Sequence, residues 1–288
     1  MNDLVRLWRR GGIKLSLGFF GVFLLVFMAS VGPFIVPYDP YKQDMTHAFM
    51  PPELLREEGF PYLLGTDVLG RDIFSRIVIG SRVSLAVGIT AVLVCGTFGV
   101  VLGMIAGFRG GAIDAVIMRF VDIQLALPYL LIAVAILAIL GEGLWKVILV
   151  LAIAGWVAYG RVVRAEVTKI MVLPYIEAAR TLGIGTLSLL WRHILPSVAP
   201  SILVISTLQV ATMILFEAAL SFLGLGIQPP VPTWGSMMGE GRLYISIAWW
   251  QVTFPGLLIT LSVISLNLFG EGLREALDYR SDQTTSPP

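Results

Sequence analysis

Six long apolar stretches, separated by shorter polar segments, dominate the pattern along the chain. They lie at about 15–36, 83–108, 120–140, 144–159, 200–226 and 247–269. About 20 apolar residues in a helix cross the roughly 30 Å of bilayer hydrocarbon, and a helix satisfies its own backbone polar groups there. A membrane β-barrel would instead show short alternating segments. The pattern therefore predicts an all-α integral membrane protein with six transmembrane helices.

The composition agrees with a chain embedded in a lipid bilayer. Of the 288 residues, 57% are hydrophobic and 14% charged, whereas soluble domains carry about 25% charged residues. The formal net charge of +1 gives no electrostatic reason to expect a nucleic-acid partner. Cys95 is the single cysteine, which excludes an internal disulfide.

The first apolar run admits two interpretations. Arg6, Arg9, Arg10 and Lys14 precede it, as basic residues precede the apolar core of a signal peptide. The run is about 22 residues long, however, which is enough to cross the membrane. We therefore interpret 15–36 as a retained first span.

Basic residues predict the orientation, because they gather on the cytoplasmic side. They concentrate before the first span, in the segment between the fourth and fifth spans, and after the sixth. We expect both termini in the cytoplasm. The expected division is a cytoplasmic segment 1–14, a first span 15–36, an extracytoplasmic loop 37–82, a five-helix core 83–271 that includes the cytoplasmic loop 161–198, and a cytoplasmic tail 272–288.

The cytoplasmic loop contains an unusually polar pair of short helices. Ala178 and Ala179 favour a first helix, in which Glu177 can pair with Arg180. Gly183 is a suitable C-terminal stop. A second helix follows, which Thr186 or Ser188 can cap and which Pro196 is expected to end.

From the residues alone, two roles fit this loop. Small alanines on an exposed helix allow close approach by the groove of a partner protein. Alternatively, the segment rests on lipid headgroups through Trp191 and Arg192.

The stretch "EAARTLG", followed nine residues later by "HILP", resembles the EAA loop of ABC importer permeases. The resemblance implies a type I ABC importer permease fold in which this loop forms the coupling helix that enters a groove of the ATP-hydrolysing subunit. His193 stands where the general pattern has isoleucine. The positions carried over are Glu177, Ala178, Ala179, Arg180, Gly183, His193, Leu195 and Pro196.

Three further segments, 65–85, 216–238 and 266–280, resemble the dipeptide, oligopeptide and nickel branch of these permeases, and the C-type subunit in particular. Tyr279 departs from a more frequent proline. The resemblance implies a bacterial plasma-membrane permease for di- or oligopeptides, with nickel and glutathione as alternative substrates. It also implies a B-type permease partner, one or two cytoplasmic ATP-binding subunits that hold ATP and Mg, and an extracytoplasmic peptide-binding protein.

Three polar residues inside the apolar runs are candidates for the translocation path. Glu217 is the strongest, because a charge at mid-membrane is costly and must face protein or water. Its alternative role is a buried structural hydrogen bond. Asn267 can instead bridge helices, and Asp122 can instead pair with Arg119.

Other features of the apolar runs predict packing. Pro128 is expected to kink the third span. Small residues at helical spacing indicate close packing, either within the subunit or against a partner permease, with pore lining as the lesser alternative; they are Gly88, Gly96, Gly99, Gly103 and Gly107.

The extracytoplasmic face is predicted from the loop 37–82 together with "QPPVPTWGSMM", which would receive the binding protein. Trp234, Trp249 and Trp250 lie near span ends, where indole rings anchor at the membrane interface.

No motif of an enzyme is evident. The sequence shows neither a Walker phosphate loop nor a Ser-His-Asp set. His47 and His193 lie on opposite predicted sides and cannot share one metal. We expect a non-catalytic subunit without a cofactor of its own. The rival functions are a stand-alone channel or ion-coupled transporter, which would carry midplane charges or broken helices, and a non-transporting membrane scaffold.

Overall fold

A computed structural model describes residues 2–53 and 60–284, with side chains from residue 11 to residue 277 outside that gap. Within these residues the chain is helical, and its only β pairing is an isolated bridge between Thr66 and Asp72. The main helices are α1 (Asn2–Ser30), α2 (Ile73–Arg109), α3 (Gly111–Leu125), α4 (Tyr129–Leu140), α5 (Leu144–Ile170), α6 (Pro174–Thr181), α7 (Thr186–Leu189), α8 (Leu195–Phe222), α9 (Trp234–Gly241) and α10 (Trp250–Thr284).

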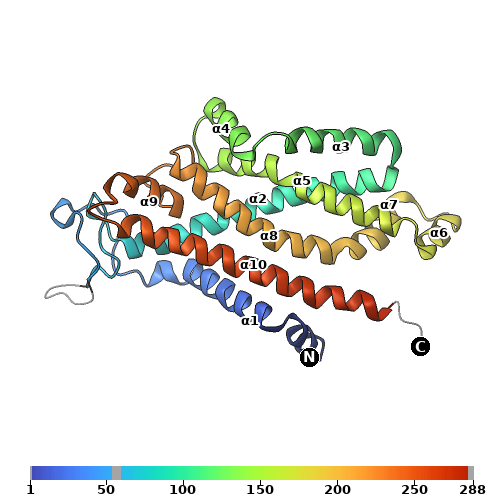
Figure 1. Cartoon of the computed structure of the whole chain (residues 1–288), viewed down its shortest axis with the longest axis horizontal. Helices are drawn as coiled ribbons and strands as arrows, with labels where there is room; N and C mark the ends of the chain where they lie inside the picture. Colours follow the sequence, from blue (N-terminus) through green and yellow to red (C-terminus); the bar gives the residue numbers. More distant parts are fainter. Residues whose placement is uncertain (1, 54–59, 285–288) are drawn as a thin grey trace.

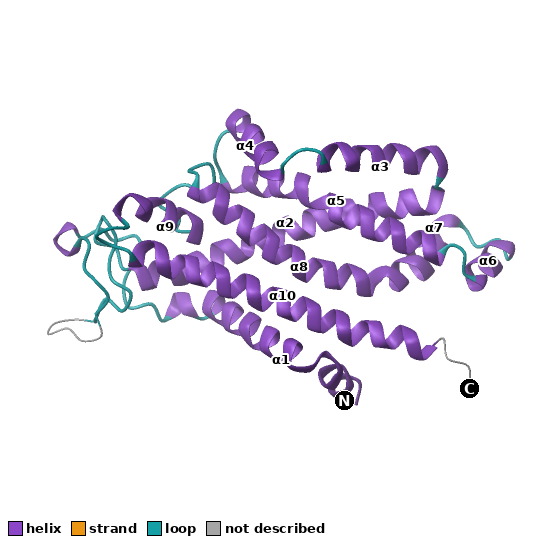
Figure 2. Ribbon diagram, viewed as in Figure 1, coloured by secondary structure: helices purple, strands orange, loops and turns teal. Residues whose placement is uncertain are grey.

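The expected all-α membrane fold is confirmed, with one correction to the third span. In the described chain, five helices are long and apolar enough to cross a membrane, and α3 with α4 makes a sixth only as a bent pair. The two halves meet at 88°, so residues 120–140 do not form one straight helix. Pro128 has no N–H to donate and adopts an extended conformation at the start of α4, which turns the expected kink into a break (Figure 2).

The helix ends also differ from the apolar runs. Helix α2 begins at Ile73, so residues 73–82, expected in the extracytoplasmic loop, belong to the helix. Asp72 caps this start by accepting a hydrogen bond from the Ser75 backbone at 2.8 Å. Arg76 and Ser81 are buried in protein, which is why a polar first turn needs no exposure to lipid. Burial also raises the pKa of Asp72 above its ordinary value.

At the opposite end of the bundle, the helices continue past the apolar runs. Helix α5 reaches Ile170 rather than 159, and its last turns carry polar residues that pair locally. The Arg164 guanidinium donates to both carboxylate oxygens of Asp114 on α3, at 2.9 and 2.6 Å. Lys169 pairs with Glu166 at 3.1 Å. Charged turns beyond the hydrocarbon are stable because water and ion pairs solvate them.

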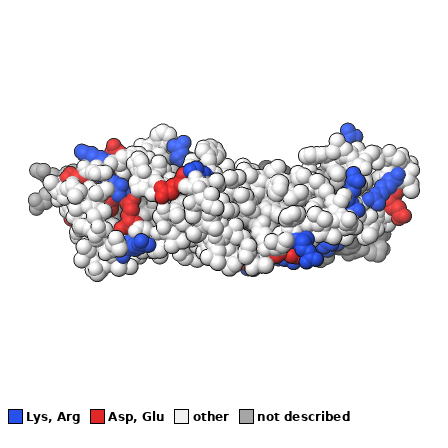
Figure 3. All heavy atoms as spheres, turned by 90° about the horizontal axis from the view of Figure 1, so that it is seen from above, with Lys and Arg blue, Asp and Glu red and all other residues white. Residues whose placement is uncertain are grey.

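The helices form an elongated bundle with two distinct ends (Figure 1). The start of α1, the end of α10 and the short helices α6 and α7 lie at one end, called here the α6 end. Helix α9 and the segment before α2 lie at the other, the α9 end. On the face shown in Figure 3, charged side chains gather toward the ends and leave a wide uncharged band between them. That band matches the hydrocarbon core of a bilayer.

The glycine stripe of α2 packs against α5, which settles the role left open above for most of its members. A Cβ on Gly99 would lie 2.4 Å from the carbonyl oxygen of Trp156. A Cβ on Gly103 or Gly107 would lie 2.8 Å from the oxygen of Gly160 or Arg164. Gly88 instead faces Ile214 of α8. The stripe therefore packs helices within the subunit, where only glycine allows this backbone approach.

We expect Gly99→Ala to lower the stability of the purified protein by about 1–3 kcal/mol, because the added methyl group must displace the α5 backbone. Thermal unfolding in detergent measures the effect. Gly185→Ala is the matched control, since a Cβ there meets no atom within 4 Å. Equal unfolding temperatures for both variants would contradict the proposed contact between α2 and α5.

Candidate functional site

Helix α6 is fastened to the bundle by one face. Ile176 is fully buried and Ala179 is 6% exposed, and both belong to an apolar cluster with Val163 and Val167 of α5 and Met104 of α2. The Leu173 residue before the helix is extended, and Pro174 occupies the first turn, where its missing N–H costs nothing. The sequence thus starts a short helix whose apolar side rests on the ends of two long ones.

The opposite face of α6 is exposed in the described chain. Glu177 and Ala178 are exposed, and Leu182 just beyond the helix is 82% exposed. The expectation that both alanines face a partner is wrong for Ala179. One residue is about 100° around a helix from the next, so Ala179 turns into the apolar cluster while Ala178 stays outside.

Gly183 ends α6 as predicted. Its φ of +76° is in the left-handed region, which glycine adopts without steric cost. Its N–H donates to the Arg180 carbonyl at 3.0 Å, and the next N–H, of Ile184, donates to the Ala179 carbonyl at 3.2 Å. These bonds satisfy the last carbonyls of the helix and fix a tight elbow.

Arg180 does not pair with Glu177 and instead contacts α2 and the end of α5. Its guanidinium carbon lies 5.3 Å from the centre of the Phe108 ring on α2, and its Nη2 lies 3.7 Å from the sulfur of Met171. The described residues contain no ion pair between Glu177 and Arg180, because a favourable ring lies within reach. Arg180 therefore gives α6 a second attachment, to the end of α2.

The second helix of the loop, which follows Gly183, was expected to end at Pro196 but continues past it. Gly185 is the N-cap of α7, without a capping side chain, and a π-helix over Leu190–Ile194 leads directly into α8. Pro196 occupies the first turn of α8, where its ring is tolerated. Leu195 packs against the apolar cluster, and the His193 carbonyl accepts from Ser197 at 2.7 Å. The segment after Gly185 is thus helically continuous with α8.

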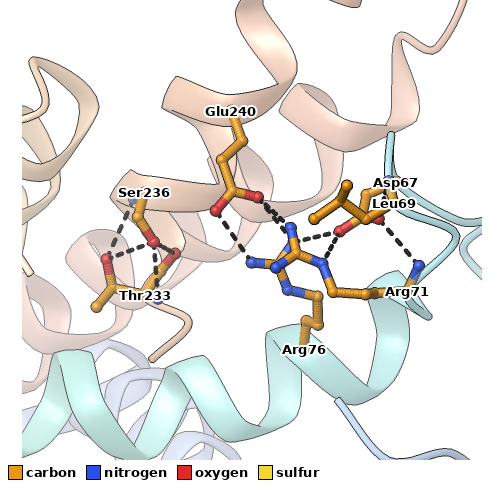
Figure 4. Close-up of polar contacts among 7 residues, drawn as sticks. All are labelled: Asp67, Leu69, Arg71, Arg76, Thr233, Ser236 and Glu240. Carbon is orange, nitrogen blue, oxygen red and sulfur yellow. Dashed lines mark hydrogen bonds and ion pairs between the residues drawn. The ribbon is translucent and has the colours of Figure 1, made fainter. Parts of the chain in front are cut away.

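A ring of buried charges organises the α9 end (Figure 4). Arg71 Nε donates to Asp67 at 2.6 Å, and its Nη2 donates to Glu240 of α9 at the same distance. Arg76 of α2 also binds both carboxylates, with Glu240 at 2.9 Å and 3.2 Å. The two arginines and Asp67 are nearly inaccessible. This arrangement fastens α9 to the start of α2.

Three tryptophans were expected at the membrane interface, but two of them are buried in protein at the α9 end. Trp234 is fully buried and donates to the Ile77 carbonyl at 3.1 Å. Trp250 is 5% exposed and donates to the Thr66 carbonyl at 3.0 Å. Only Trp249, 51% exposed, suits the interface. The buried indoles join the two segments that the sequence assigned to the extracytoplasmic face.

Glu217 of α8 lies inside the protein, between two serine side chains. Its side chain is fully buried, and its carboxylate accepts hydrogen bonds from Ser221 at 2.7 Å and from Ser84 of α2 at 3.2 Å. Glu217 therefore joins α8 to α2, which agrees with the alternative role of a buried structural hydrogen bond. Glu217 does not line the cavity between the last turn of α8 and helix α9.

The structure does not gather the three expected path residues into one site. Asp122 is exposed on α3, Asn267 is partly buried on α10, and Glu217 is on α8. No contact joins them in the described chain, nor does Asp122 pair with Arg119 there. Gln124, two residues along α3, makes contacts with α5 that the sequence did not predict. Its amide donates to the Ile153 carbonyl at 2.9 Å and accepts from the Trp156 indole at 2.9 Å.

Sequence analysis also missed the charge ring. The i, i+4 spacing of Asp67 and Arg71 is a detectable signal for one pair. Glu240, 164 positions after Arg76, carries no such signal, because only the packing of α9 on α2 brings them together.

Comparison with known proteins identifies the family to which this architecture belongs. Residues 99–283 match the family described as "Binding-protein-dependent transport system inner membrane component". This chain belongs to that family of inner-membrane permeases. Residues 16–52 additionally match the "N-terminal TM domain of oligopeptide transport permease C". The sequence-based assignment to the C-type ABC importer permeases is confirmed.

Curated relatives match the permease over most of its length. It is 46% identical to the di/tripeptide transport system permease protein DppC of Pseudomonas aeruginosa (strain UCBPP-PA14), over 91% of this chain and 86% of that protein. It is 42% identical to the glutathione transport system permease protein GsiD of Pectobacterium atrosepticum, over 94% and 89%. The oligopeptide transport system permease protein OppC of Bacillus subtilis is 38% identical, over 89% and 82%.

A solved structure shares the fold of the permease. The MetNI methionine ABC transporter, in inward-facing conformations, matches with a TM-score of 0.50 and 19% identity, over 70% of this chain and 95% of the matched one. That similarity supports the type I importer fold and says nothing of the substrate.

We expect Glu217→Leu to destabilise the permease by about 1–3 kcal/mol, because the Ser84 and Ser221 hydroxyls lose a buried partner. Glu217→Gln puts an amide where the carboxylate was, so both hydroxyls keep a partner, and we expect this variant to assemble and transport normally. Thermal unfolding and peptide uptake by reconstituted importer measure the two properties. A stable, assembled Glu217→Gln importer with a changed transport rate would instead assign Glu217 to the translocation path.

Proposed function

We propose that this permease is the C-type subunit of a bacterial ABC importer for short peptides, and that α6 is the helix through which ATP-driven motion enters the membrane. The observation that carries the proposal is the two-sided character of α6. One face is fixed to α5 and α2, and the other presents Glu177, Ala178 and Leu182 to solvent. A helix that only rested on lipid would not need three separate attachments to the bundle.

The attachments define a path for the motion. A push on α6 reaches α5 through Ile176 and Ala179, α2 through Arg180, and α8 through the continuous helix after Gly185. Packed interiors move as rigid bodies and switch between discrete arrangements. Closure of the ATPase subunits around ATP would therefore tilt three membrane helices together and change the side to which the pathway opens.

The remaining partners follow from the same assignment. The basic residues at the α6 end support a cytoplasmic location for this end and for both termini. A homologous B-type permease completes the pathway, and one or two cytoplasmic subunits supply ATP hydrolysis with Mg. The α9 end faces outward and receives a peptide-binding protein on the surface built from α9 and the segment before α2.

Short peptides are the proposed substrate class, since di- and tripeptide permeases stand among the relatives at 46% and 39% identity. Glutathione, itself a small peptide, is the second candidate, because glutathione permeases are 42% and 40% identical to this chain. Uptake of labelled dipeptide and of labelled glutathione into vesicles with all subunits present separates the two.

For the residues inside the membrane, we propose that Glu217 positions α8 against α2, while Asp122 and Asn267 remain candidates for the translocation path. A stand-alone channel or ion-coupled transporter would move substrate without nucleotide, and a scaffold would move none. ATP-dependent uptake by the complete complex, absent without its ATPase subunits, distinguishes the importer from both.

We expect Glu177→Arg to abolish most uptake while the protein inserts and folds normally, because the exposed side chain has no role within the subunit. Glu142→Arg is the matched control, an exposed charge reversal outside the α6 end. Uptake at the wild-type rate by Glu177→Arg, or an equal loss in both variants, would contradict the proposed coupling role.

Gly183→Pro is expected to uncouple transport in the same way, for a different reason. Proline cannot adopt the +76° φ of Gly183 and lacks the N–H that bonds Arg180. We expect nucleotide binding by the complex without peptide uptake. Normal transport by this variant would show that the elbow is not required.

Crosslinking tests which face of α6 contacts the ATPase subunit. With a cysteine at each alanine, we expect Ala178→Cys to form a disulfide or bismaleimide bridge to the ATPase subunit, and Ala179→Cys to form none. The two positions share a helix and differ only in exposure, so each serves as the control for the other. Equal capture from both positions, or from neither, would overturn the proposed docking face.

A further inference from the structure

A cavity of about 240 Å³ lies at the α9 end, between the last turn of α8 and helix α9. Its walls include Phe222, Leu223, Ile227, Gln228, Glu240 and Arg242. Sites that bury an entire small molecule occupy roughly 300–1,000 Å³. This cavity is therefore sized for part of a ligand, such as one residue of a peptide.

The charges around the cavity leave one cation uncompensated. The Glu240 carboxylate is already bound by Arg71 and Arg76, and with Asp67 these four charges sum to zero. Arg242 lies with its guanidinium carbon 5.7 Å from the centre of the Phe222 ring. It makes no ion pair in the described chain. Arg242 is exposed at the rim of this partly apolar cavity, where its guanidinium can bind an anion.

The other walls add two features to the anion site. Phe222, Leu223 and Ile227 provide apolar surface beside Arg242. The Gln228 amide nitrogen donates to the Gly224 carbonyl at 2.8 Å, and its oxygen accepts no hydrogen bond from the described residues. That oxygen can accept a peptide N–H. The cavity wall thus includes a partner for a carboxylate, an apolar surface and an acceptor for a backbone N–H.

We propose that this cavity is an entrance subsite for the C-terminal residue of a transported peptide, whose carboxylate binds Arg242 and whose side chain packs on the apolar wall. The inference rests on the proposed import of peptides. An acidic side chain from a docked protein would satisfy Arg242 but leave the apolar wall uncovered. A peptide terminus carries both groups on one residue.

The test uses a thiol on the cavity wall of the complete importer, purified without the binding protein. Cys95 is 1% exposed, so Leu223→Cys gives this chain a single accessible thiol on a side chain that is 52% exposed. Maleimide labelling of this chain is followed with the peptide Ala-Ala-Leu as free acid and as C-terminal amide. We expect the free acid to slow labelling at least about threefold, and the amide to leave it unchanged.

Substitution of Arg242 in the same background identifies the group that binds. We expect Arg242→Gln to abolish protection by the free acid and Arg242→Lys to retain part of it, because lysine keeps the charge without the forked geometry. Leu243→Cys, on a residue 77% exposed and outside the cavity wall, is the control and should show no protection. Circular dichroism of each variant confirms that the fold is intact.

Three results would overturn the subsite. They are equal protection by acid and amide, protection only when the binding protein is added, and a Leu223→Cys thiol that the assembled importer covers before any peptide is present. Uptake assays on the same preparations, reconstituted into vesicles with the binding protein added back, keep the two proposals separate. ATP-driven peptide uptake without protection would remove the subsite alone, whereas absence of peptide uptake would remove the proposed function.

Discussion

The backbone contact between α2 and α5 is the constraint on which the rest of the permease depends. Gly99, Gly103 and Gly107 bring the helices so close that a single methyl group would meet the opposite carbonyl. Apolar side chains gain little by leaving lipid for protein, so van der Waals packing of this kind must hold the bundle together. The same two helices carry the attachments of α6, through Val167 and Phe108. This pair of helices would carry the motion that we propose enters through α6.

Polar groups hold the parts that glycine packing does not reach. The bent pair α3–α4 meets α5 through buried apolar residues, and two polar contacts from α3 add to them. Asp114 binds Arg164 near the α6 end, and Gln124 binds α5 backbone carbonyls and the Trp156 indole farther along. Because hydrocarbon offers no competing hydrogen bonds, such contacts set the position of a helix that has little apolar burial of its own.

The charge ring at the α9 end selects one packing arrangement of α9 on α2 and adds less to the stability of the fold. The two arginines and Asp67 are buried and Glu240 is partly buried, so these charges lose most of their hydration, which the ion pairs offset only when the geometry is good. Two arginines shared between Asp67 and Glu240 meet that condition. Removing any one of them would leave a buried charge without its partner. The ring therefore fixes one arrangement of α9 on α2 and leaves Arg242 as the free cation beside them.

The sequence by itself determined the class, the family and the position of α6, because these depend on local apolar length, on helix-ending glycine and on motif spacing. It did not show that the third of the six expected spans is a bent pair of helices. Gly183 and Pro128 acted through their own backbone preferences, so their positions were predictable. Only the tertiary structure decided which way Ala178 and Ala179 point, that Trp234 and Trp250 are buried, and that Glu240 meets Arg76. Each of these depends on which surfaces of distant helices meet, and no local pattern of residues carries that information.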